Sequence, residues 1–323
     1  MKPLEGAQAW LITDGKAGHE AQAQGVAEAL GVAYTWRRIA AAGLAKHLAP
    51  WGPPPGNFAC EPPWPAIAIG IGRTAMPALR RLHKRAGLAT FTVALQDPRT
   101  SARIADLIWV PKHDRRRGAN VITTLTPPHR FTPELLEELR TLPAPAIEAL
   151  AQPRVMLAVG GAAKVWRFSD VDIECLAAAI KRIGEAGASF MVTTSRRTPE
   201  AVHVALAAAL QPFQHILYSG QGENPYAQFL AKADLIIVTA DSVSMTGEAL
   251  ASGRPVYVFS PSGGSEKFRR YHEALKQVGA TRELKPELPV TFDWAHAPIF
   301  AADQIARAIE ERWQNRARFI VTK

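Results

Sequence analysis

Small hydroxyl side chains and one carboxylate follow the apolar stretch Leu235 to Val238. Ser242 and Ser244 come first, and Glu248 lies four residues after Ser244, so that on a helix these two side chains share one face. Free amides in the first turn of a helix, together with the helix dipole, favour an anion such as phosphate. A carboxylate one turn further along suits ribose hydroxyls. The spacing therefore predicts a phosphate and ribose site, and simple capping of the helix by the serines is the alternative.

The segments around this motif have the pattern of a strand, a helix and a second strand. Leu235 to Val238 is short, branched and unbroken, which is typical of a strand covered on both faces of a parallel sheet. Gly253 can end the helix with a positive φ, and Pro255 prevents its continuation. The same pattern of strand, helix and strand recurs along the chain. We therefore expect an α/β fold with parallel sheets, whose ligands bind where strands end and helices begin.

Three further strand ends in the second half of the chain carry polar groups that could complete this site. The residues are Gly161 and Lys164 after the strand at 155–159, Thr194, Ser195 and Arg196 after the strand at 189–193, and Asn224, Pro225 and Tyr226 after the strand at 215–218. An arginine flanked by hydroxyls could clamp a diphosphate in bidentate fashion, although a helix start with a solvated arginine is the alternative. Because the ends of parallel strands meet at one edge of a sheet, these loops and the segment with Ser242, Ser244, Met245 and Glu248 predict a composite pocket.

The first half of the chain has its own polar strand ends. The loop at 13–19 contains glycines that let a ligand approach the backbone, and Lys16 and His19 could hold an anion or an acceptor group. It is not a phosphate-binding P-loop, because the Gly-Lys-Ser/Thr ending is missing. Gly70 and Gly72 resemble the dinucleotide fingerprint only weakly, since the third glycine is missing.

Asp97 is a candidate general base, if the two domains close over a substrate. It precedes Pro98, and an aspartate before proline is commonly a turn residue, which is the alternative. His19 is the second candidate base. The acceptor side of the predicted site consists of Gly15, Lys16, Gly72, Arg73 and Gln96.

Length and composition indicate two domains with ample apolar material for their cores. The chain has 323 residues, of which 47% are hydrophobic. Prolines punctuate the stretch 142–153, which is the predicted linker. We expect a first domain over 1–145, a second over 153–298, and a helical segment over 299–323 that packs back on the first domain.

Charge and cysteine content restrict the partners. A net charge of +9 favours anionic partners such as nucleotides or acidic lipid surfaces. The basic run 115–117 lacks interleaved aromatic residues, so nucleic acid is not an expected partner. Two cysteines are too few for a disulfide framework or a thiolate metal site. Asp170 and Asp172 fit the first turn of a helix capped by Ser169 better than a divalent metal site.

No apolar window is long enough to cross a membrane, and the first residues lack the apolar core of a signal peptide. We therefore expect a soluble cytoplasmic protein, with peripheral contact with the inner face of an anionic membrane as an option.

These motifs together resemble the mitochondrial-fission family named for elongated mitochondria. The resemblance runs over nearly the full length and rests on Asp14-Gly-Lys16 through Gln22, Gln96-Asp-Pro98, Pro111-Lys-His-Asp114, Thr193 to Pro199, Asn224-Pro-Tyr226 and Thr239 to Ala249. The family usually has serine where this chain has Gly247, a difference that should not disturb Ser244 or Glu248. The family looks similar to two-domain glycosyltransferases of the GT-B type, in which two Rossmann-like domains face each other and the second holds the nucleotide.

The resemblance implies a nucleotide-sugar site at Arg196, Asn224, Ser242, Ser244 and Glu248. We therefore expect a metal-independent glycosyltransferase that uses a nucleotide-diphosphate sugar as donor and needs no bound cofactor. The sugar would pass to an unknown acceptor, with lipid-linked and polysaccharide acceptors as options. A nucleotide-sugar epimerase or hydrolase is one alternative. A non-catalytic nucleotide-binding or membrane-associated protein of the fission type is the other.

Overall fold

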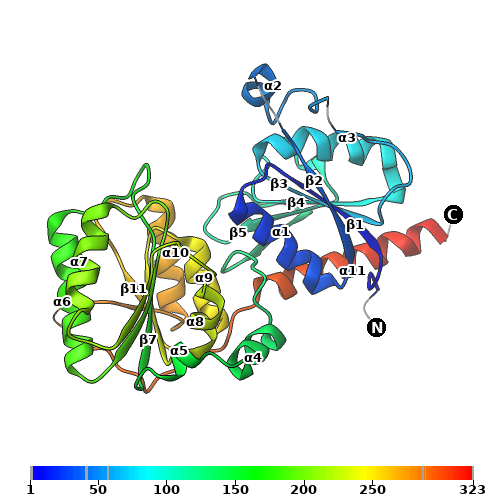
Figure 1. Cartoon of the computed structure of the whole chain (residues 1–323). Coiled ribbons are helices and arrows are strands. Elements are labelled where there is room, and N and C mark those ends of the chain that lie inside the picture. Colours follow the sequence, from blue (N-terminus) through cyan, green and yellow to red (C-terminus); the bar gives the residue numbers. More distant parts are fainter. Residues whose placement is uncertain (1–2, 41–42, 57, 286, 288, 322–323) are drawn as a thin grey trace. The chain divides into compact units, whose positions relative to one another are not determined.

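The chain forms two units, each built on its own six-stranded parallel sheet (Figure 1). The computed structural model describes residues 3–40, 43–56, 58–285, 287 and 289–321. Unit 1 comprises Met1–Arg130 and Phe300–Lys323, and unit 2 comprises Phe131–Ile299. The predicted α/β class is confirmed, and the two Rossmann-like units are those of the GT-B class.

The sheet of unit 1 has the strand order β2-β1-β3-β4-β5-β6. Its strands are β1 (Gln8–Thr13), β2 (Ala33–Arg38), β3 (Ile67–Ile71), β4 (Phe91–Leu95), β5 (Leu107–Pro111) and β6 (Val121–Thr124). Its helices are α1 (Ala17–Leu30), α2 (Gly43–Leu48), α3 (Met76–Ala86) and α11 (Ala301–Val321), with short 3₁₀ turns at 73–75, 87–89 and 102–104. Leu11 and Ile69 belong to the core under α1 and α11, whereas Ile12 and Ala68 belong to the core under α3. Alternate side chains along each strand thus point into the two cores, and both faces of the sheet are buried.

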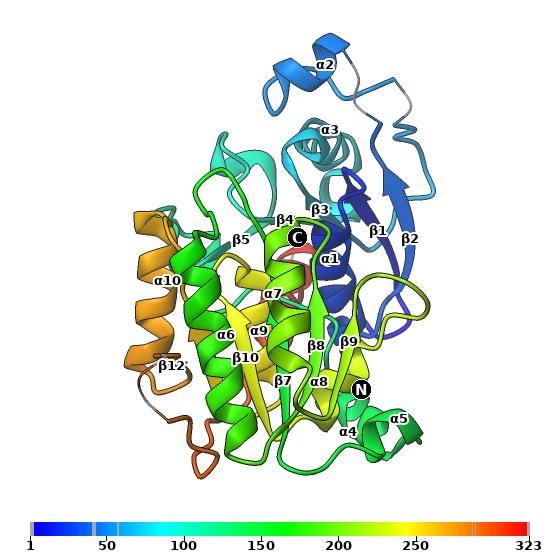
Figure 2. The same ribbon diagram turned by 60° about the vertical axis from the view of Figure 1, so that its left-hand side comes forward.

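The sheet of unit 2 has the order β12-β11-β10-β7-β8-β9. Its strands are β7 (Arg154–Val159), β8 (Ser189–Thr194), β9 (His215–Tyr218), β10 (Leu235–Thr239), β11 (Val256–Phe259) and β12 (Arg282–Glu283). Helices α6 (Asp170–Glu185) and α7 (Glu200–Leu210) cover one face, and α8 (Tyr226–Lys232), α9 (Val243–Ala251) and α10 (Glu266–Gln277) cover the other (Figures 1 and 2). Every residue of β10 is buried, as expected for a central parallel strand.

Two short helices, α4 (Pro133–Thr141) and α5 (Pro145–Glu148), precede the second sheet. The side chain of Arg140 on α4 donates hydrogen bonds to the carbonyl oxygens of Ala231 (3.4 Å) and Ser252 (3.2 Å). In return, Lys232 Nζ donates to the carbonyl oxygen of Arg140 (2.9 Å). Because these bonds attach α4 to unit 2, the contacts divide the chain between residues 130 and 131, upstream of the proline-punctuated stretch at 142–153.

The helix α11 packs against α1 within unit 1 and inserts Ile305 and Ile309 into its core. It begins at Ala301 and extends to Val321, within the segment 299–323 that was expected to be helical, while residues 322–323 lie outside the described residues. Arg316 attaches the helix to the sheet, because its guanidinium lies 3.1 Å from Asp106 Oδ2 and donates to the carbonyl oxygens of Thr90 and Gly87.

Candidate functional site

In both sheets the strand order reverses beside the first strand. In unit 2, β7 lies between β8 and β10, so the chain proceeds outward in one direction through β8 and β9 and in the other through β10 and β11. In unit 1, β1 likewise lies between β2 and β3, so the strands at the reversal are β1 and β3. Doubly wound proteins bind ligands outside the carboxyl ends of the strands at such a reversal. The loops after β7 and β10, and those after β1 and β3, are therefore the candidate ligand-binding loops.

The buried carboxylate of Asp241 organises the reversal point of unit 2. Its side chain has no solvent exposure. Oδ2 accepts a hydrogen bond from the Gly161 amide (2.9 Å), and Oδ1 accepts one from Thr239 Oγ1 (2.7 Å). The same hydroxyl accepts from the Gly160 amide (2.7 Å). The turns after β7 and β10 are thus held together by one charged residue.

Two consecutive glycines are required by this arrangement. A Cβ at Gly160 would lie 2.2 Å from the Asp241 carboxylate, and a Cβ at Gly161 would lie 2.2 Å from the backbone of Arg197. Both distances are far shorter than any van der Waals contact. Gly161 is accordingly buried under the turn after β8. Only a residue without a side chain fits at this predicted site position.

The turn after β8 contributes Arg197 to this network, although both Arg197 and its neighbour Arg196 are exposed. The guanidinium of Arg197 lies 3.4 Å from Asp241 Oδ2 and also donates to the carbonyl oxygen of Ala162 (3.4 Å). Ser195 shapes the turn, because its hydroxyl accepts from the Arg197 amide (3.2 Å). Of the two adjacent arginines, Arg197 therefore supports the loops, and Arg196, the predicted ligand, is exposed.

The first turn of α9 presents the predicted phosphate seat. Ser242 is the N-cap, since its Oγ accepts from the Met245 amide (3.3 Å). Thr246 Oγ1 donates back to the Ser242 carbonyl (2.9 Å), so the first turn is held from both sides. The side chains of Ser242, Ser244 and Met245 are half-buried. Gly253 follows the end of this helix with φ of +71°, as the sequence predicted.

Glu248 on α9 is joined to the loop that opens α8. Tyr226 donates its phenolic proton to Glu248 Oε2 (2.7 Å). Burial and the adjoining carboxylate raise the pKa of Tyr226 well above its ordinary value, so the phenol stays protonated and remains a donor. The carboxylate of Glu248 is therefore oriented before any ligand arrives.

The remaining predicted residues of unit 2 lie at the ends of β7, β8 and β9, which follow β10 in that order across the sheet. Asn224 Oδ1 accepts from the Tyr226 amide (3.0 Å), and Pro225 is the N-cap of α8. Thr194 Oγ1 lies 3.5 Å from the Tyr218 carbonyl oxygen, while Lys164 is exposed in the loop after β7. The four loops meet at one edge of the sheet, and the Tyr226 to Glu248 and Arg197 to Asp241 contacts connect three of them directly.

The reversal point of unit 1 has a smaller polar cluster around Asp14. Its carboxylate lies 2.7 Å from His19 Nδ1 and 2.8 Å from Lys16 Nζ. Burial raises the pKa of Asp14, but hydrogen bonds from Lys16 and His19 outweigh burial and bring the pKa below its ordinary value. Gly72, with φ of +91°, passes so close that a Cβ there would lie 2.8 Å from the Asp14 carboxyl carbon and 2.9 Å from His19 Nδ1. Gly15 also has a positive φ of +77°.

The other predicted residues of unit 1 have partners of their own. Asp97 Oδ1 accepts from Arg116 Nε (2.6 Å) and from the Arg99 amide (2.9 Å), which is the geometry of a turn residue. Gln96 donates through Nε2 to Gln22 Oε1 (3.2 Å). In the preceding loop, the exposed side chain of Arg73 donates to the Lys46 carbonyl (2.9 Å).

Asp172, at the start of α6, takes part in capping that helix. Ser169 and Asp172 form a reciprocal capping box, as the sequence favoured, and Asp172 Oδ2 also accepts from the Ser262 amide (3.0 Å). Within the described part of the chain, no group of three or more His, Cys, Asp or Glu side chains could hold a metal ion. None of the described helices is both long and apolar enough to span a bilayer.

Sequence reasoning gave no role to Asp14, Arg197 or Asp241. Asp14 and Asp241 stand within the quoted motifs, but their importance depends on partners that only the fold provides. The sequence signal that could have identified the two aspartates is their charge. A lone aspartate in a glycine-rich or hydroxyl-rich turn directly after a buried strand must be paired or hydrogen-bonded if the turn is buried.

Comparison with protein families gives a match to residues 17–313, in the family described as Mitochondrial fission ELM1. The chain belongs to this family. The Mitochondrial fission protein ELM1 of Arabidopsis thaliana is 25% identical over 282 residues, which cover 78% of this chain and 66% of that protein. An uncharacterized protein of Rickettsia prowazekii (strain Madrid E) is 30% identical over 162 residues, or 47% of this chain and 44% of that protein. The matched part spans less than two thirds of either relative.

Solved structures with little sequence identity share the fold of this ELM1-family chain. A putative UDP-N-acetylglucosamine 2-epimerase from Listeria monocytogenes has a TM-score of 0.60 at 13% identity and covers 96% of this chain and 97% of its own. The UDP-GlcNAc 2-epimerase of Methanocaldococcus jannaschii, in complex with UDP-GlcNAc and UDP, has a TM-score of 0.51 at 10% identity, covering 94% and 99%. The glycotransferase of kitacinnamycin has a TM-score of 0.50 at 14% identity, covering 98% and 95%. At these identities the likeness establishes the fold alone.

Proposed function

We propose that this chain binds a nucleotide-diphosphate sugar on unit 2 and transfers the sugar to an acceptor hydroxyl without a metal ion. The observation that carries the proposal is the Asp241 network, which fixes the loops after β7, β8 and β10 beside the N-terminus of α9. Turns fixed in this way beside a helix N-terminus, at a strand reversal, suit a diphosphate. Proteins of the same fold whose names include a glycotransferase and epimerases of UDP-GlcNAc support the nucleotide-sugar class.

In this proposal each group of the site has one task. The first-turn amides of α9, with Arg196 and Lys164, stabilise the negative charge that develops on the leaving diphosphate. Both cationic side chains are exposed and can extend toward a ligand. Glu248, already oriented by Tyr226, accepts hydrogen bonds from the ribose hydroxyls. Asn224 and Pro225 adjoin the nucleobase of the donor.

The acceptor hydroxyl loses its proton to His19 in this mechanism. Asp14 holds Nδ1 of the imidazole (2.7 Å), which leaves Nε2 to take the proton, so Asp14 is a positioning residue. Asp97, the other candidate, already accepts from Arg116 and Arg99 through one carboxylate oxygen. His19 is therefore the proposed base, and an acceptor with a free hydroxyl, lipid-linked or polysaccharide, is the proposed second substrate.

Calorimetric titration with UDP, GDP, ADP and UDP-GlcNAc tests the donor site. We expect one nucleotide to bind the wild type and Glu248→Ala to weaken that binding at least tenfold, because a carboxylate hydrogen bond is worth about 1.5–3 kcal/mol. Glu174→Ala, on the exposed side of α6, is the matched control and should bind like the wild type. Binding of no nucleotide, or an unchanged affinity in a folded Glu248→Ala variant, would refute the site.

The epimerase or hydrolase alternative is separated by omitting the acceptor. UDP-GlcNAc incubated with the protein alone is expected to remain intact under the transferase proposal. Appearance of an epimeric nucleotide sugar, or of free sugar with UDP, would favour the alternative, and nuclear magnetic resonance of the anomeric protons distinguishes these products.

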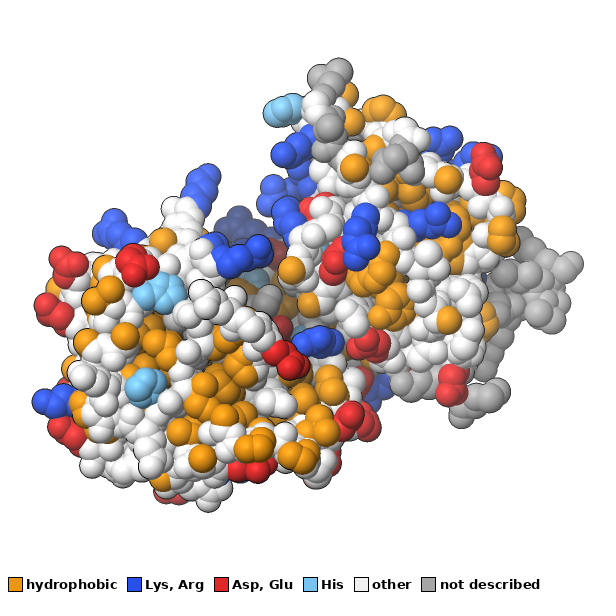
Figure 3. Space-filling model, viewed as in Figure 1, with side chains coloured by type: hydrophobic (Ala, Val, Ile, Leu, Met, Phe, Trp, Pro, Cys, Tyr) orange, Lys and Arg blue, Asp and Glu red, His pale blue; other side chains and the backbone are white. Residues whose placement is uncertain are grey.

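A second candidate function, contact with an anionic membrane, rests on a different surface of unit 1. Trp51 is 66% exposed, and its loop is fixed by Arg80, whose guanidinium donates to the carbonyl oxygens of Trp51 (2.9 Å) and Gly52. The exposed side of α3 carries Arg81, Lys84 and Arg85. Figure 3 shows Lys and Arg side chains beside α2 and over α3. An exposed aromatic ring on a loop attached to a basic helix suits the interface of an acidic bilayer.

Sedimentation with lipid vesicles tests this second candidate. We expect binding to vesicles with phosphatidylserine and none to pure phosphatidylcholine, with a loss of binding as salt rises. Trp51→Ser should weaken binding, whereas Val204→Ser, at a 61% exposed position in unit 2, should leave it unchanged. Failure of the wild type to sediment with anionic vesicles at low salt would exclude the membrane role.

A further inference from the structure

The loops at the carboxyl edge of the unit 1 sheet carry an excess of cations. The strands of this sheet pair in parallel, so the segments 14–20, 38–40, 72–75, 96–100 and 112–117, at or after the ends of β1 to β5, share one edge. These segments contain eight Lys and Arg residues and four Asp and Glu residues. A positive excess concentrated at one edge of a sheet favours an anionic ligand there.

Three of these cations have no carboxylate partner within the described parts of the chain. The nearby carboxylates are engaged elsewhere, in the ion pairs Asp14 with Lys16, Glu20 with Arg38 and Asp97 with Arg116. Arg73, Arg99 and Lys112 are exposed, and no described carboxylate oxygen lies within 4.0 Å of their charged nitrogens. Their charges are therefore available to a ligand.

Two of these free cations lie on the loops that surround the proposed base. Arg73 follows β3 and Arg99 follows β4, while Lys16 follows β1 on the other side of β3. Neighbouring strands are about 4.8 Å apart, so these three strand ends fall within about 10 Å. The β3 loop touches the base, because a Cβ at Gly72 would lie 2.9 Å from His19 Nδ1. An acceptor whose hydroxyl reaches His19 thus has three cationic loops around its neighbouring groups.

Arg99 is held in a backbone conformation that is unfavourable for a residue with a side chain. Its φ is +53°, and Gln96 in the same loop has a φ of +73°. Glycine would adopt such angles without strain. The turn is fixed all the same, since Asp97 Oδ1 accepts from the Arg99 amide (2.9 Å) and from Arg116 Nε (2.6 Å). Strained residues of this kind cluster at ligand sites, which points to a role for the Arg99 side chain.

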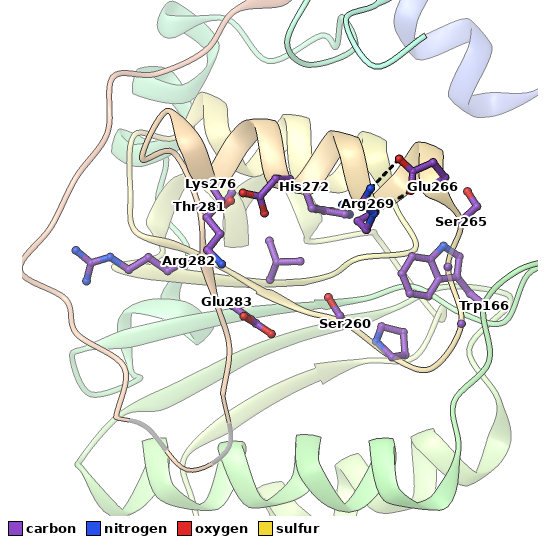
Figure 4. A pocket seen from close by; sticks show the side chains of 15 residues that line it. Trp166, Ser260, Ser265, Glu266, Arg269, His272, Lys276, Thr281, Arg282 and Glu283 are labelled. Carbon is purple, nitrogen blue, oxygen red and sulfur yellow. Dashed lines mark hydrogen bonds and ion pairs between the residues drawn. The ribbon is translucent and has the colours of Figure 1, made fainter. Parts of the chain in front are cut away.

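The pocket beside α10 in unit 2 has balanced charges instead. Its volume is about 540 Å³, and its charged lining consists of three carboxylates and three cations: Glu266, Glu273, Glu283, Arg269, Lys276 and Arg282. Figure 4 shows Glu266 and Arg269 paired near the start of α10, with 2.8 Å between their closest atoms. A lining without net charge has no electrostatic preference for an anion. The cationic excess is therefore not a feature of every concave surface of the protein.

We propose that the carboxyl edge of the unit 1 sheet binds a phosphate or diphosphate group of the sugar acceptor. The guanidinium groups of Arg73 and Arg99 pair with its oxygens, and the Lys16 ammonium adds a further donor. Identifying this ligand as the acceptor rests on the proposed function. An uncharged polysaccharide is thereby excluded as acceptor, and the phosphate belongs either to a lipid carrier or to a soluble sugar phosphate.

Calorimetric titration with phosphorylated probes tests the site and separates the two sources. Pyrophosphate and glucose 1-phosphate are the soluble probes, geranyl diphosphate is the lipid-linked probe, and glucose is the uncharged control. A nucleotide that binds the wild type is present at saturation, so that the diphosphate seat of unit 2 is already filled. A lipid carrier is indicated if geranyl diphosphate binds more tightly than pyrophosphate. Tighter binding of glucose 1-phosphate than of pyrophosphate indicates a sugar phosphate.

Arg73→Gln and Arg99→Gln each remove one guanidinium and keep a polar side chain. We expect the affinity for the bound probe to fall at least tenfold in each variant, the value of one charge-assisted hydrogen bond. Arg307→Gln, at an exposed position on α11, removes the same charge from the same unit and should leave the affinity unchanged. Circular dichroism checks that the variants are folded.

The proposal is overturned if no phosphorylated probe binds, or if neither Arg73→Gln nor Arg99→Gln weakens binding more than Arg307→Gln does. Its failure is distinguishable from that of the proposed function. If no nucleotide binds, the donor site on unit 2 is refuted, and the probe titrations without nucleotide still decide whether unit 1 binds phosphate.

Discussion

Removal of the Asp241 carboxylate should destabilise unit 2 by about 3 kcal/mol. Asp241→Ala leaves the Gly161 amide and the Thr239 hydroxyl buried without an acceptor, at about 1–3 kcal/mol each. The desolvation cost of the carboxylate disappears in the variant and offsets part of this loss. The contact with Arg197 adds little, because the Arg197 side chain is 52% exposed and solvent screens the pair. Asp241→Asn retains one acceptor oxygen and should cost less, about 1–2 kcal/mol.

Hydrogen exchange resolves this effect at the site itself. The Gly161 amide is the donor to Asp241 Oδ2, so in Asp241→Ala its protection should fall about a hundredfold relative to the wild type, which corresponds to about 3 kcal/mol. Urea denaturation followed by circular dichroism gives the accompanying loss of global stability. Glu174→Ala, at an exposed position on α6, is the control and should stay within about 0.5 kcal/mol. If Asp241→Ala loses less than about 1 kcal/mol and keeps Gly161 protected, the carboxylate does not hold the loops together.

Two further predictions concern the close approach at Gly161 and the attachment of α11. Gly161→Ala should lower the free energy of unfolding, measured by urea denaturation, by about 1–3 kcal/mol. The control Gly118→Ala, whose Cβ would meet only an ordinary 3.4 Å contact, should change it little. Equal effects of the two substitutions would show that the close approach at Gly161 is not the cause. Burial raises the pKa of Asp106, but hydrogen bonds from His83 and Thr92 and the charge of Arg316 lower it below its ordinary value. Its stabilisation is therefore complete above about pH 4 and is lost as the pH falls further. Asp106→Asn should flatten the acid limb of a stability–pH curve, while Glu311→Gln, exposed on α11, should not.

Local signals predicted the parts of the site that depend on near neighbours in sequence. Ser242 caps α9 and Gly253 follows its end with a positive φ, and both roles depend only on residues within a few positions. The parallel sheets followed from apolar runs such as Leu235–Thr239, which are buried on both faces.

Features that depend on distant partners were not predictable. Nothing near Asp241 in the sequence indicates Gly161, eighty positions away, as the donor to its carboxylate. The choice between Arg196 and Arg197 depends on the turn that Ser195 imposes, since adjacent residues in a turn point in different directions. The division of the chain at residue 130 likewise depends on Arg140, whose contacts with α8 and α9 are invisible in a pattern of prolines.

The return of α11 to unit 1 has a consequence for how the protein is made. The ribosome synthesises β1 to β6 first, but Ile305 and Ile309, which complete the core beside α1, emerge only after the whole of unit 2. During elongation, unit 2 can therefore acquire its native packing while the apolar surface under α11 in unit 1 is still uncovered. Such a surface is where nascent chains recruit chaperones or aggregate. Slow translation near the last helix should thus reduce soluble yield more than slow translation within unit 2.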